Sequence, residues 1–233
     1  MRPLIGITLD WKESGSFSKR PHYCLRQAYF DAVYASGGLP IALPLHTEGH
    51  DDYLNMLHGV VVPGGDYPSP GWWYGKTDDV EAHPRATADV AIIRRVLARK
   101  MPLLGICAGM QTLAVATGGK LHWDIKTALG VQGHRTVAAE HEAHPVELRL
   151  GTKLRALTGD KLTVNVNSHH NEGVASVGPG VVVSATAPDG VIEAIEVPDH
   201  PFAVGVQWHP EFMLENGVDR ALFEGLMAAA QKG

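Results

Sequence analysis

A cysteine with a glycine two positions away on each side is the clearest chemical signal of the sequence. The run Gly105-Ile106-Cys107-Ala108-Gly109 joins an apolar segment to a segment with helical patterning. This is the arrangement of a nucleophile elbow, with cysteine in place of serine. Such a sharp turn lifts the sulfur above the end of a sheet and places it at a helix N-terminus, where the dipole favours a thiolate. A buried structural cysteine between two glycines is the alternative interpretation.

The second signal is a histidine and a glutamate two positions apart, in the run His209-Pro210-Glu211. A thiolate nucleophile requires a base, and the base requires an orienting carboxylate. If the chain stays extended, His209 and Glu211 face the same side, and Pro210 restricts the backbone between them. A helix that starts at Pro210 explains the tripeptide almost as well.

The glycine pair Gly64-Gly65 is the third signal, because it directly follows an apolar run. Glycines at such a place let backbone N–H groups point into a site. One of these N–H groups, together with that of Ala108, could hold the oxyanion of a tetrahedral intermediate. A simple Gly-Gly turn is the alternative.

All three signals lie at the ends of predicted strands. In the first half, short apolar runs alternate with helical patterns, which predicts a parallel sheet covered on both faces. Catalytic groups in such sheets gather at the carboxyl edge. The predicted strands span residues 4–9, 40–45, 59–63 and 102–107, and the predicted helices span 22–36, 81–99 and 108–117.

The second half has a different pattern. Alternation of apolar and polar residues predicts mixed or antiparallel strands, followed by a strand that ends at the His209 run and a last helix. The strands span 146–150, 162–166, 191–197 and 202–208, and the helix spans about 217–231. The predicted fold is an α/β three-layer sandwich with a mostly parallel central sheet flanked by helices, plus a smaller antiparallel sheet, in a single domain over 1–233. The segment 66–80, with Trp72, Trp73 and Tyr74, is a long loop that could pack internally, cover a substrate or contact a second copy.

Composition excludes several classes of protein. The 233 residues include 20 Lys plus Arg and 25 Asp plus Glu, with 45% hydrophobic and 19% charged residues, which argues against a disordered chain. The net charge of −5 and the lack of a basic block argue against nucleic acid as a partner. Cys24 and Cys107 are too few for a disulfide framework, and we find no signal peptide or membrane span. We therefore expect a cytoplasmic protein that has no membrane partner.

Taken together, the motifs resemble the class I glutamine amidotransferase superfamily, and within it the gamma-glutamyl-gamma-aminobutyrate hydrolase branch. The resemblance covers essentially the whole chain. It rests on these runs in order: Arg2-Pro3-Leu4-Ile5-Gly6-Ile7-Thr8, Ala35-Ser36-Gly37-Gly38-Leu39-Pro40, Pro63-Gly64-Gly65-Asp66, Gly105-Ile106-Cys107-Ala108-Gly109-Met110-Gln111, Asn167-Ser168-His169-His170, Ala187-Pro188-Asp189-Gly190-Val191-Ile192-Glu193-Ala194, and Gly205-Val206-Gln207-Trp208-His209-Pro210-Glu211.

The resemblance implies a set of site residues. It implies a Cys107–His209–Glu211 triad and an oxyanion hole from the backbone of Gly65 and Ala108. It further implies that Gln111 contacts the glutamyl group of a substrate, and that Ser168 and His169 hold its amino-acid head.

The sequence departs from this branch at two places. Many hydrolases of the branch have arginine directly after the nucleophile, where this chain has Ala108. The familiar loop of the branch also has one more residue between the glycine pair and the aspartate, whereas Asp66 follows Gly65 directly. Because that loop borders the leaving-group side, the amine of the substrate stays open.

The 13 histidines raise the question of a metal site. His134, His141 and His144 lie close in sequence and His169-His170 is a pair, but none matches a zinc spacing with cysteines or the helical pattern of two histidines and a glutamate. We therefore expect no metal and no cofactor. We expect Asp189 to serve a turn and Glu193 a strand, and Cys24 to be an inert thiol.

Three functions are compatible with these motifs. The first is a free-standing hydrolase that cleaves gamma-glutamyl amides through a thioester, with a small-molecule substrate and a possible homodimer. The second is the glutaminase subunit of a two-protein amidotransferase, which supplies ammonia to a synthase. The third is a catalytically silent binding or regulatory homologue, against which the intact set of Cys107, His209 and Glu211 argues.

Overall fold

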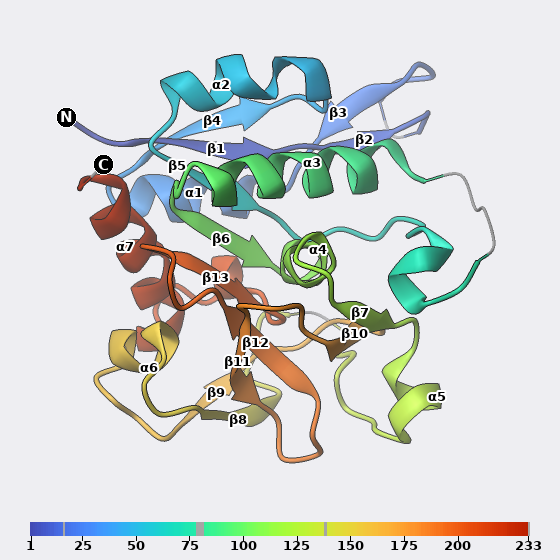
Figure 1. Ribbon diagram of the computed structural model, residues 1–233, viewed down its shortest axis with the longest axis vertical. Helices are drawn as coiled ribbons and strands as arrows, with labels where there is room; N and C mark the ends of the chain where they lie inside the picture. Colours follow the sequence, from blue (N-terminus) through green and yellow to red (C-terminus); the bar gives the residue numbers. More distant parts are fainter. Residues whose placement is uncertain (16, 78–81, 138, 233) are drawn as a thin grey trace.

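A single large sheet runs through the computed structural model, which describes residues 1–15, 17–77, 82–137 and 139–232 (Figure 1). Five neighbouring strands of this sheet are parallel, so their carboxyl ends lie at one edge. In spatial order they are β4 (Leu39–Leu43), β1 (Leu4–Thr8), β5 (Gly59–Val62), β6 (Leu103–Ile106) and β13 (Ala203–Val206).

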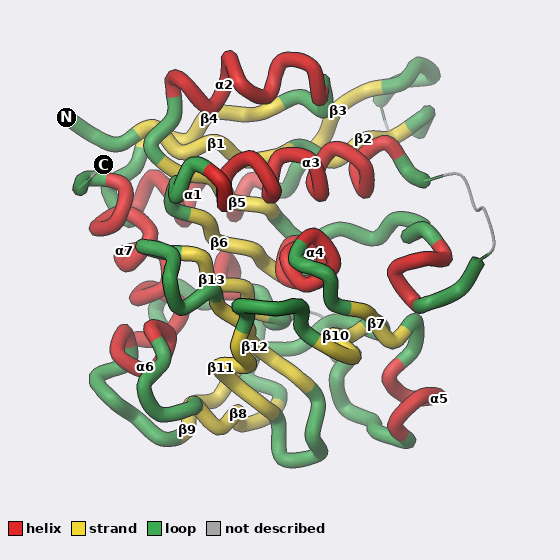
Figure 2. Tube along the Cα trace, in the orientation of Figure 1, coloured by secondary structure: helices red, strands yellow, loops and turns green. Residues whose placement is uncertain are grey.

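Helices cover both faces of the parallel strands (Figure 2). α1 (Gln27–Ala35) and α7 (Gly217–Ala230) pack on one face, while α2 (His50–Met56), α3 (Pro84–Ala98) and α4 (Ala108–Ala116) pack on the other. Successive residues of β5 enter different cores: Val61 packs beneath α1 and α7, whereas Val60 and Val62 pack beneath α3 and α4. Burial on both sides explains why these strands are unbroken apolar runs.

Antiparallel strands of the second half extend the same sheet beyond β13. They are β12 (Ile192–Glu196), β11 (Val182–Thr186), β8 (His144–Leu148) and β9 (Thr163–Val166), and β10 (Gly173–Ser176) pairs with both β12 and β7 (Lys120–His122). A separate two-stranded sheet pairs β2 (Asp10–Lys12) with β3 (His22–Cys24). The predicted fold class is confirmed, with the antiparallel strands joined to the central sheet.

The predicted helix over 22–36 is wrong in its first part. Residues 22–24 form strand β3 because they pair with β2, and this tertiary pairing overrides the local pattern. The helix begins at Gln27, after Arg26 in an extended conformation. Cys24 accordingly lies on a strand. For the predicted helix over 81–99, residue 81 lies outside the described residues, and α3 begins at Pro84.

Several short elements carry too few apolar positions to be predicted from the sequence. They are α5 (Ile125–Leu129), α6 (Lys153–Leu157), and the 3-10 helices η1 (Thr47–Gly49), η2 (Gly71–Tyr74) and η3 (Pro210–Phe212). η2 lies in the predicted loop 66–80, of which residues 78–80 are outside the described residues. Within η2, Trp73 is buried while Trp72 is exposed, so the two tryptophans differ in role.

Candidate active site

Cys107 occupies a strained turn between β6 and α4. Its backbone has φ 51° and ψ −106°, a left-handed φ that residues other than glycine rarely adopt. The flanking glycines are required by packing: a Cβ on Gly105 would lie 2.8 Å from the backbone of Gly109, and a Cβ on Gly109 would collide with the carbonyl oxygen of Val62. The predicted elbow is therefore present, and Cys107 is the N-cap of a nine-residue helix.

His209 follows β13 and is held at both its backbone and its side chain. Asn167 binds the peptide groups of His209, since its Nδ2 donates to the His209 carbonyl at 2.7 Å and its Oδ1 accepts from the His209 N–H at 2.8 Å. The imidazole Nδ1 lies 2.8 Å from Oε1 of Glu211. The chain does not stay extended between them, because the 3-10 helix η3 begins at Pro210 and brings Glu211 round to His209.

The imidazole and the thiol meet around Gly64. A Cβ placed on Gly64 would lie 2.9 Å from Cε1 of His209 and 3.3 Å from Cβ of Cys107, so only glycine leaves room there. Gln207 also reaches this point, with its Nε2 3.5 Å from the sulfur of Cys107. Burial by itself lowers the pKa of His209, but the charges of Glu211 and Cys107 outweigh it and raise this pKa to about 10. A pKa of this value keeps the imidazole of His209 protonated near neutral pH.

A buried arginine fixes the glycine loop that lies next to the thiol. Arg85 of α3 donates to the carbonyl oxygens of Pro63 and Gly64, the latter at 3.0 Å, and pairs with Asp89 at 3.0 Å. These contacts fix the backbone of the loop at Pro63 and Gly64. The Gly64 N–H donates to the hydroxyl of Tyr29 at 3.0 Å and is thus already used.

Gly65 and Ala108 line the cavity that opens over Cys107. As the first residue of α4, Ala108 has an N–H with no acceptor inside the helix. The two backbone groups named as an oxyanion hole thus lie on the cavity wall, and their role stays a prediction.

The cavity has a volume of about 370 Å³ and carries charges of both signs. Arg26 and Arg135 line it, as do Asp66, Asp124 and Glu172. Burial, together with the charge of Asp66, raises the pKa of Glu172 to about 7, although a hydrogen bond from Tyr74 opposes the shift. A cavity of this size and polarity suits a small zwitterionic molecule.

The three residues predicted to bind substrate are placed differently. His169 lines the cavity. Gln111 also lines it, but its amide Nε2 donates to the Glu172 carbonyl at 3.0 Å and to Oε1 of Gln207 at 3.1 Å. Ser168 is fully buried, does not line this cavity, and donates to the His134 carbonyl at 2.8 Å. Its hydroxyl therefore holds the segment after β9 in place.

Sequence reasoning gave no role to Arg85, Asn167, Gln207 or Tyr29. The spacing of Arg85 and Asp89, four residues apart on one helix, was a signal for a buried ion pair. Asn167 and Gln207 stand inside the motifs quoted above, yet their partners come from distant segments. Tyr29 contacts Gly64 across 35 positions of sequence, which no local pattern reveals.

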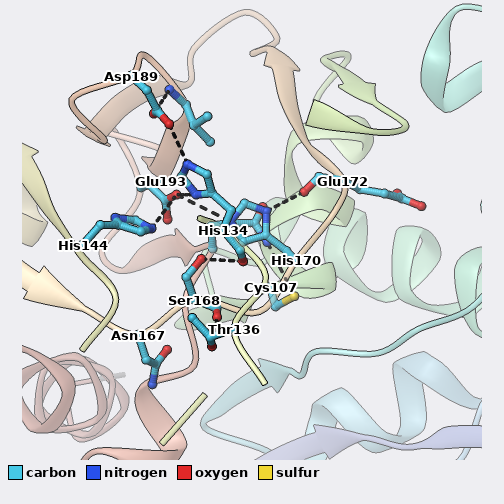
Figure 3. Close-up of polar contacts among 12 residues, drawn as sticks. Cys107, His134, Thr136, His144, Asn167, Ser168, His170, Glu172, Asp189 and Glu193 are labelled. Atoms are coloured by element: carbon cyan, nitrogen blue, oxygen red, sulfur yellow. Dashed lines mark hydrogen bonds and ion pairs between the residues drawn. The ribbon is translucent and has the colours of Figure 1, made fainter. Parts of the chain in front are cut away.

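Three of the histidines considered in the sequence as possible metal ligands lie close together beside this cavity. His134, His144 and His170 surround the carboxylate of Glu193 (Figure 3). The sequence gave no metal-binding pattern here, because these residues come from four separate segments. This cluster is considered below.

Among the described residues, no helix is long and apolar enough to cross a membrane.

The chain is similar to known proteins over most of its length. The model of the family "Peptidase C26" matches residues 3–211. The chain is 38% identical to the gamma-glutamyl-gamma-aminobutyrate hydrolase PuuD of Escherichia coli K12, over 89% of this chain and 86% of that protein. It is 30% identical to a glutamine amidotransferase-like protein of Rickettsia prowazekii, over 99% of this chain and 98% of that protein.

A solved structure supports the fold alone. The glutaminase domain of Trypanosoma brucei CTPS, with bound acivicin, has a TM-score of 0.65 at 16% identity, covering 99% of this chain and 94% of that one. The match over residues 3–211 and the similarity to PuuD over most of both chains decide the assignment. The chain belongs to the peptidase C26 family of class I glutamine amidotransferase-like proteins.

Proposed function

We propose that the protein is a cysteine-dependent hydrolase that cleaves gamma-glutamyl amides to glutamate and a free amine, and that residues 1–233 act as one domain. The observation that carries this proposal is the convergence of Cys107, on a strained helix N-terminus, with a histidine held 2.8 Å from a buried glutamate. The 38% identity to PuuD favours the gamma-glutamyl class of substrate.

In the proposed mechanism, the Cys107 thiolate attacks the side-chain carbonyl carbon of the gamma-glutamyl amide. The new C–S bond leaves the negative charge on the carbonyl oxygen, which the N–H groups of Gly65 and Ala108 bind. The C–N bond then breaks while the imidazolium of His209 gives its proton to the departing amine. His209 next takes a proton from water, and the resulting hydroxide attacks the thioester to release glutamate and the thiolate. Glu211 holds the imidazole in orientation throughout.

The cavity charges suggest how the glutamyl head is bound. Asp66 and Glu172 lie near enough that one carboxylate raises the pKa of the other. An α-ammonium group placed between them would relieve this repulsion. Arg135 lines the same cavity and is the candidate partner of the α-carboxylate. His169 and the side-chain oxygen of Gln111 complete the proposed wall of the glutamyl site. Ser168 does not touch the substrate in this proposal, but its hydrogen bond to the His134 carbonyl holds the segment that carries His169.

The test is glutamate release from a panel of gamma-glutamyl amides, including glutamine, with the Cys107→Ala variant as blank. Rapid turnover of one substituted amide over glutamine supports the hydrolase and identifies its leaving group. Weak turnover of every amide contradicts it. In that case stimulation of glutamine cleavage by a captured synthase would identify the ammonia-supplying subunit, and its absence would favour a silent homologue.

A further inference from the structure

The cluster around Glu193 brings together side chains from four segments. His134 lies in the loop after α5, His144 opens β8, His170 follows β9, and Glu193 is on β12. Glu193 is fully buried, and His134 and His170 are buried as well. From Oε1 of Glu193 the distances are 3.1 Å to Nδ1 of His134, 3.5 Å to Nε2 of His170 and 3.7 Å to Nε2 of His144 (Figure 3).

The facing atoms of this cluster have no hydrogen-bond partner among the described residues. This holds for the three imidazole nitrogens and for both carboxylate oxygens of Glu193. Buried polar atoms without partners are rare, and three imidazole nitrogens gathered around Oε1 of one glutamate require an explanation. Close approach without hydrogen-bond geometry is expected when each lone pair points to a shared centre between the atoms.

The opposite nitrogen of each histidine is occupied. Nε2 of His134 lies 2.9 Å from Oδ2 of Asp189, Nδ1 of His170 lies 2.8 Å from the Glu172 carbonyl, and Nδ1 of His144 lies 3.2 Å from the Pro145 carbonyl. When these outer nitrogens carry the proton, the inner nitrogens carry lone pairs. Metal-ligating histidines have this outer support as a rule.

The spacing also matches a metal ion. Donors at about 2.0–2.1 Å from a tetrahedral zinc ion are separated by about 3.3 Å. The observed separations from Glu193 lie on both sides of that value. The donor atoms of His134, His170 and Glu193 all lie within 4.8 Å of one another.

The charge of the cluster can also be balanced by a divalent ion. A divalent cation with neutral imidazoles is balanced by the carboxylates of Glu193 and Asp189. A second, smaller cavity is lined by His134 and His170.

We propose that His134, His170 and Glu193 bind a divalent transition-metal ion of the zinc type, with His144 beside the site. Nitrogen and carboxylate donors suit zinc in particular. The ion fastens the segment after β9 to β12 and to the loop after α5. That segment also carries Asn167, which holds His209, so the metal stabilises the wall of the active site without entering the reaction.

The test uses the full-length protein, stripped with a chelator and titrated with Zn²⁺ alone, with zinc content measured by mass spectrometry and unfolding followed by circular dichroism. We expect one zinc ion per chain and a rise of about 5 °C or more in Tm. Glu193→Gln and His170→Ala should abolish this binding. Asp189→Asn, at a partly exposed turn, should weaken it about 10- to 100-fold and serves if the buried variants fail to fold.

Two controls identify the ligands. His141→Ala changes an exposed histidine in the same stretch as His144 and should bind zinc as the wild type does. Cys107→Ala should also retain the ion, and Co²⁺ in its place should give d–d bands without a thiolate charge-transfer band. The proposal is overturned if the wild type binds no zinc, if Glu193→Gln and Asp189→Asn both bind it unchanged, or if Cys107→Ala loses it.

Discussion

Two groups of histidine and carboxylate lie in neighbouring parts of this molecule and differ in what the free nitrogen faces. His209 uses Nδ1 for Glu211, and its other nitrogen is left for the thiol of Cys107. Around Glu193, three histidines use their outer nitrogens for neighbours and direct the inner ones at a single carboxylate. The His209 group adjoins Cys107 and the main cavity, whereas the inner nitrogens and the carboxylate around Glu193 are buried. We infer that the group facing the free nitrogen of an imidazole, rather than the burial of that imidazole, separates a role in proton transfer from a role in metal binding.

The largest expected effect distinguishes the two thiols. Cys107→Ala should lower kcat by about 10⁴-fold or more, because no other group can form the thioester. Cys24→Ala, on β3, should leave kcat unchanged. Steady-state glutamate release measures both, and circular dichroism checks that each variant folds. Substantial turnover by Cys107→Ala would remove the proposed nucleophile.

The next comparison is between the two buried glutamates. Glu211→Gln should lower kcat by about 10²- to 10⁴-fold, since the imidazole loses its orienting charge. Glu193→Gln should instead lower zinc content and Tm, with a much smaller change in kcat. Measurement of kcat, zinc content and Tm on both variants tests this separation. Equal losses of kcat in the two variants would mean that the groups act as one.

Asn167 lies in the same chain segment as His170 and binds the backbone of His209. We expect it to act as a positioning residue. Asn167→Ala should lower kcat by about 10²-fold with little change in KM, because His209 loses the clamp on its backbone. The free energy of unfolding should also fall by about 1–3 kcal/mol, since buried peptide groups lose their partners. Asn167→Asp keeps the acceptor for the His209 N–H and should recover part of kcat. An unchanged kcat in Asn167→Ala would contradict this role.

The pH dependence of stability should differ between wild type and triad variants. Burial alone lowers the pKa of His209, but Glu211 and Cys107 raise it to about 10, so the folded state binds this proton more tightly than the unfolded chain. The protonation of His209 therefore contributes fully to the free energy of unfolding below about pH 6.5. This contribution is lost as the pH rises through about 10. Chemical denaturation between pH 6 and 10 should show this loss in the wild type and a smaller one in Glu211→Gln. If the free energy of unfolding depends on pH in the same way in both proteins, the predicted link between Glu211 and the pKa of His209 is wrong.

The smallest effect concerns substrate binding. Because burial raises the pKa of Glu172 to about 7, its carboxylate forms as the pH rises from 6 to 8. If Glu172 holds the α-ammonium group, KM should fall a few-fold over this range, and Glu172→Gln should remove that dependence while kcat is retained. Identical pH profiles of KM in both proteins would exclude Glu172 from the ammonium site.

Local patterns predicted the parallel strands, the elbow and the last helix, because each depends on short-range alternation or on glycine spacing. The elbow is a good example: the glycines at 105 and 109 are required by contacts within the turn and with β5, so they appear in the sequence at fixed distance from Cys107. The Gly64-Gly65 pair and the His209 run were recognisable for the same reason, as each ends an apolar strand.

Tertiary structure alone decided which distant side chains complete these motifs. Strand β3 formed in place of a helix because residues 10–12 were available to pair with it. Arg85 under the glycine loop, Asn167 on His209 and the convergence of His134, His144 and His170 on Glu193 each join segments far apart in the chain. A sequence records residue types and their spacing, so it determined the cysteine elbow and the helix that follows it. Contacts between segments depend on how strands order themselves in the sheet, and only the folded chain fixed those partners.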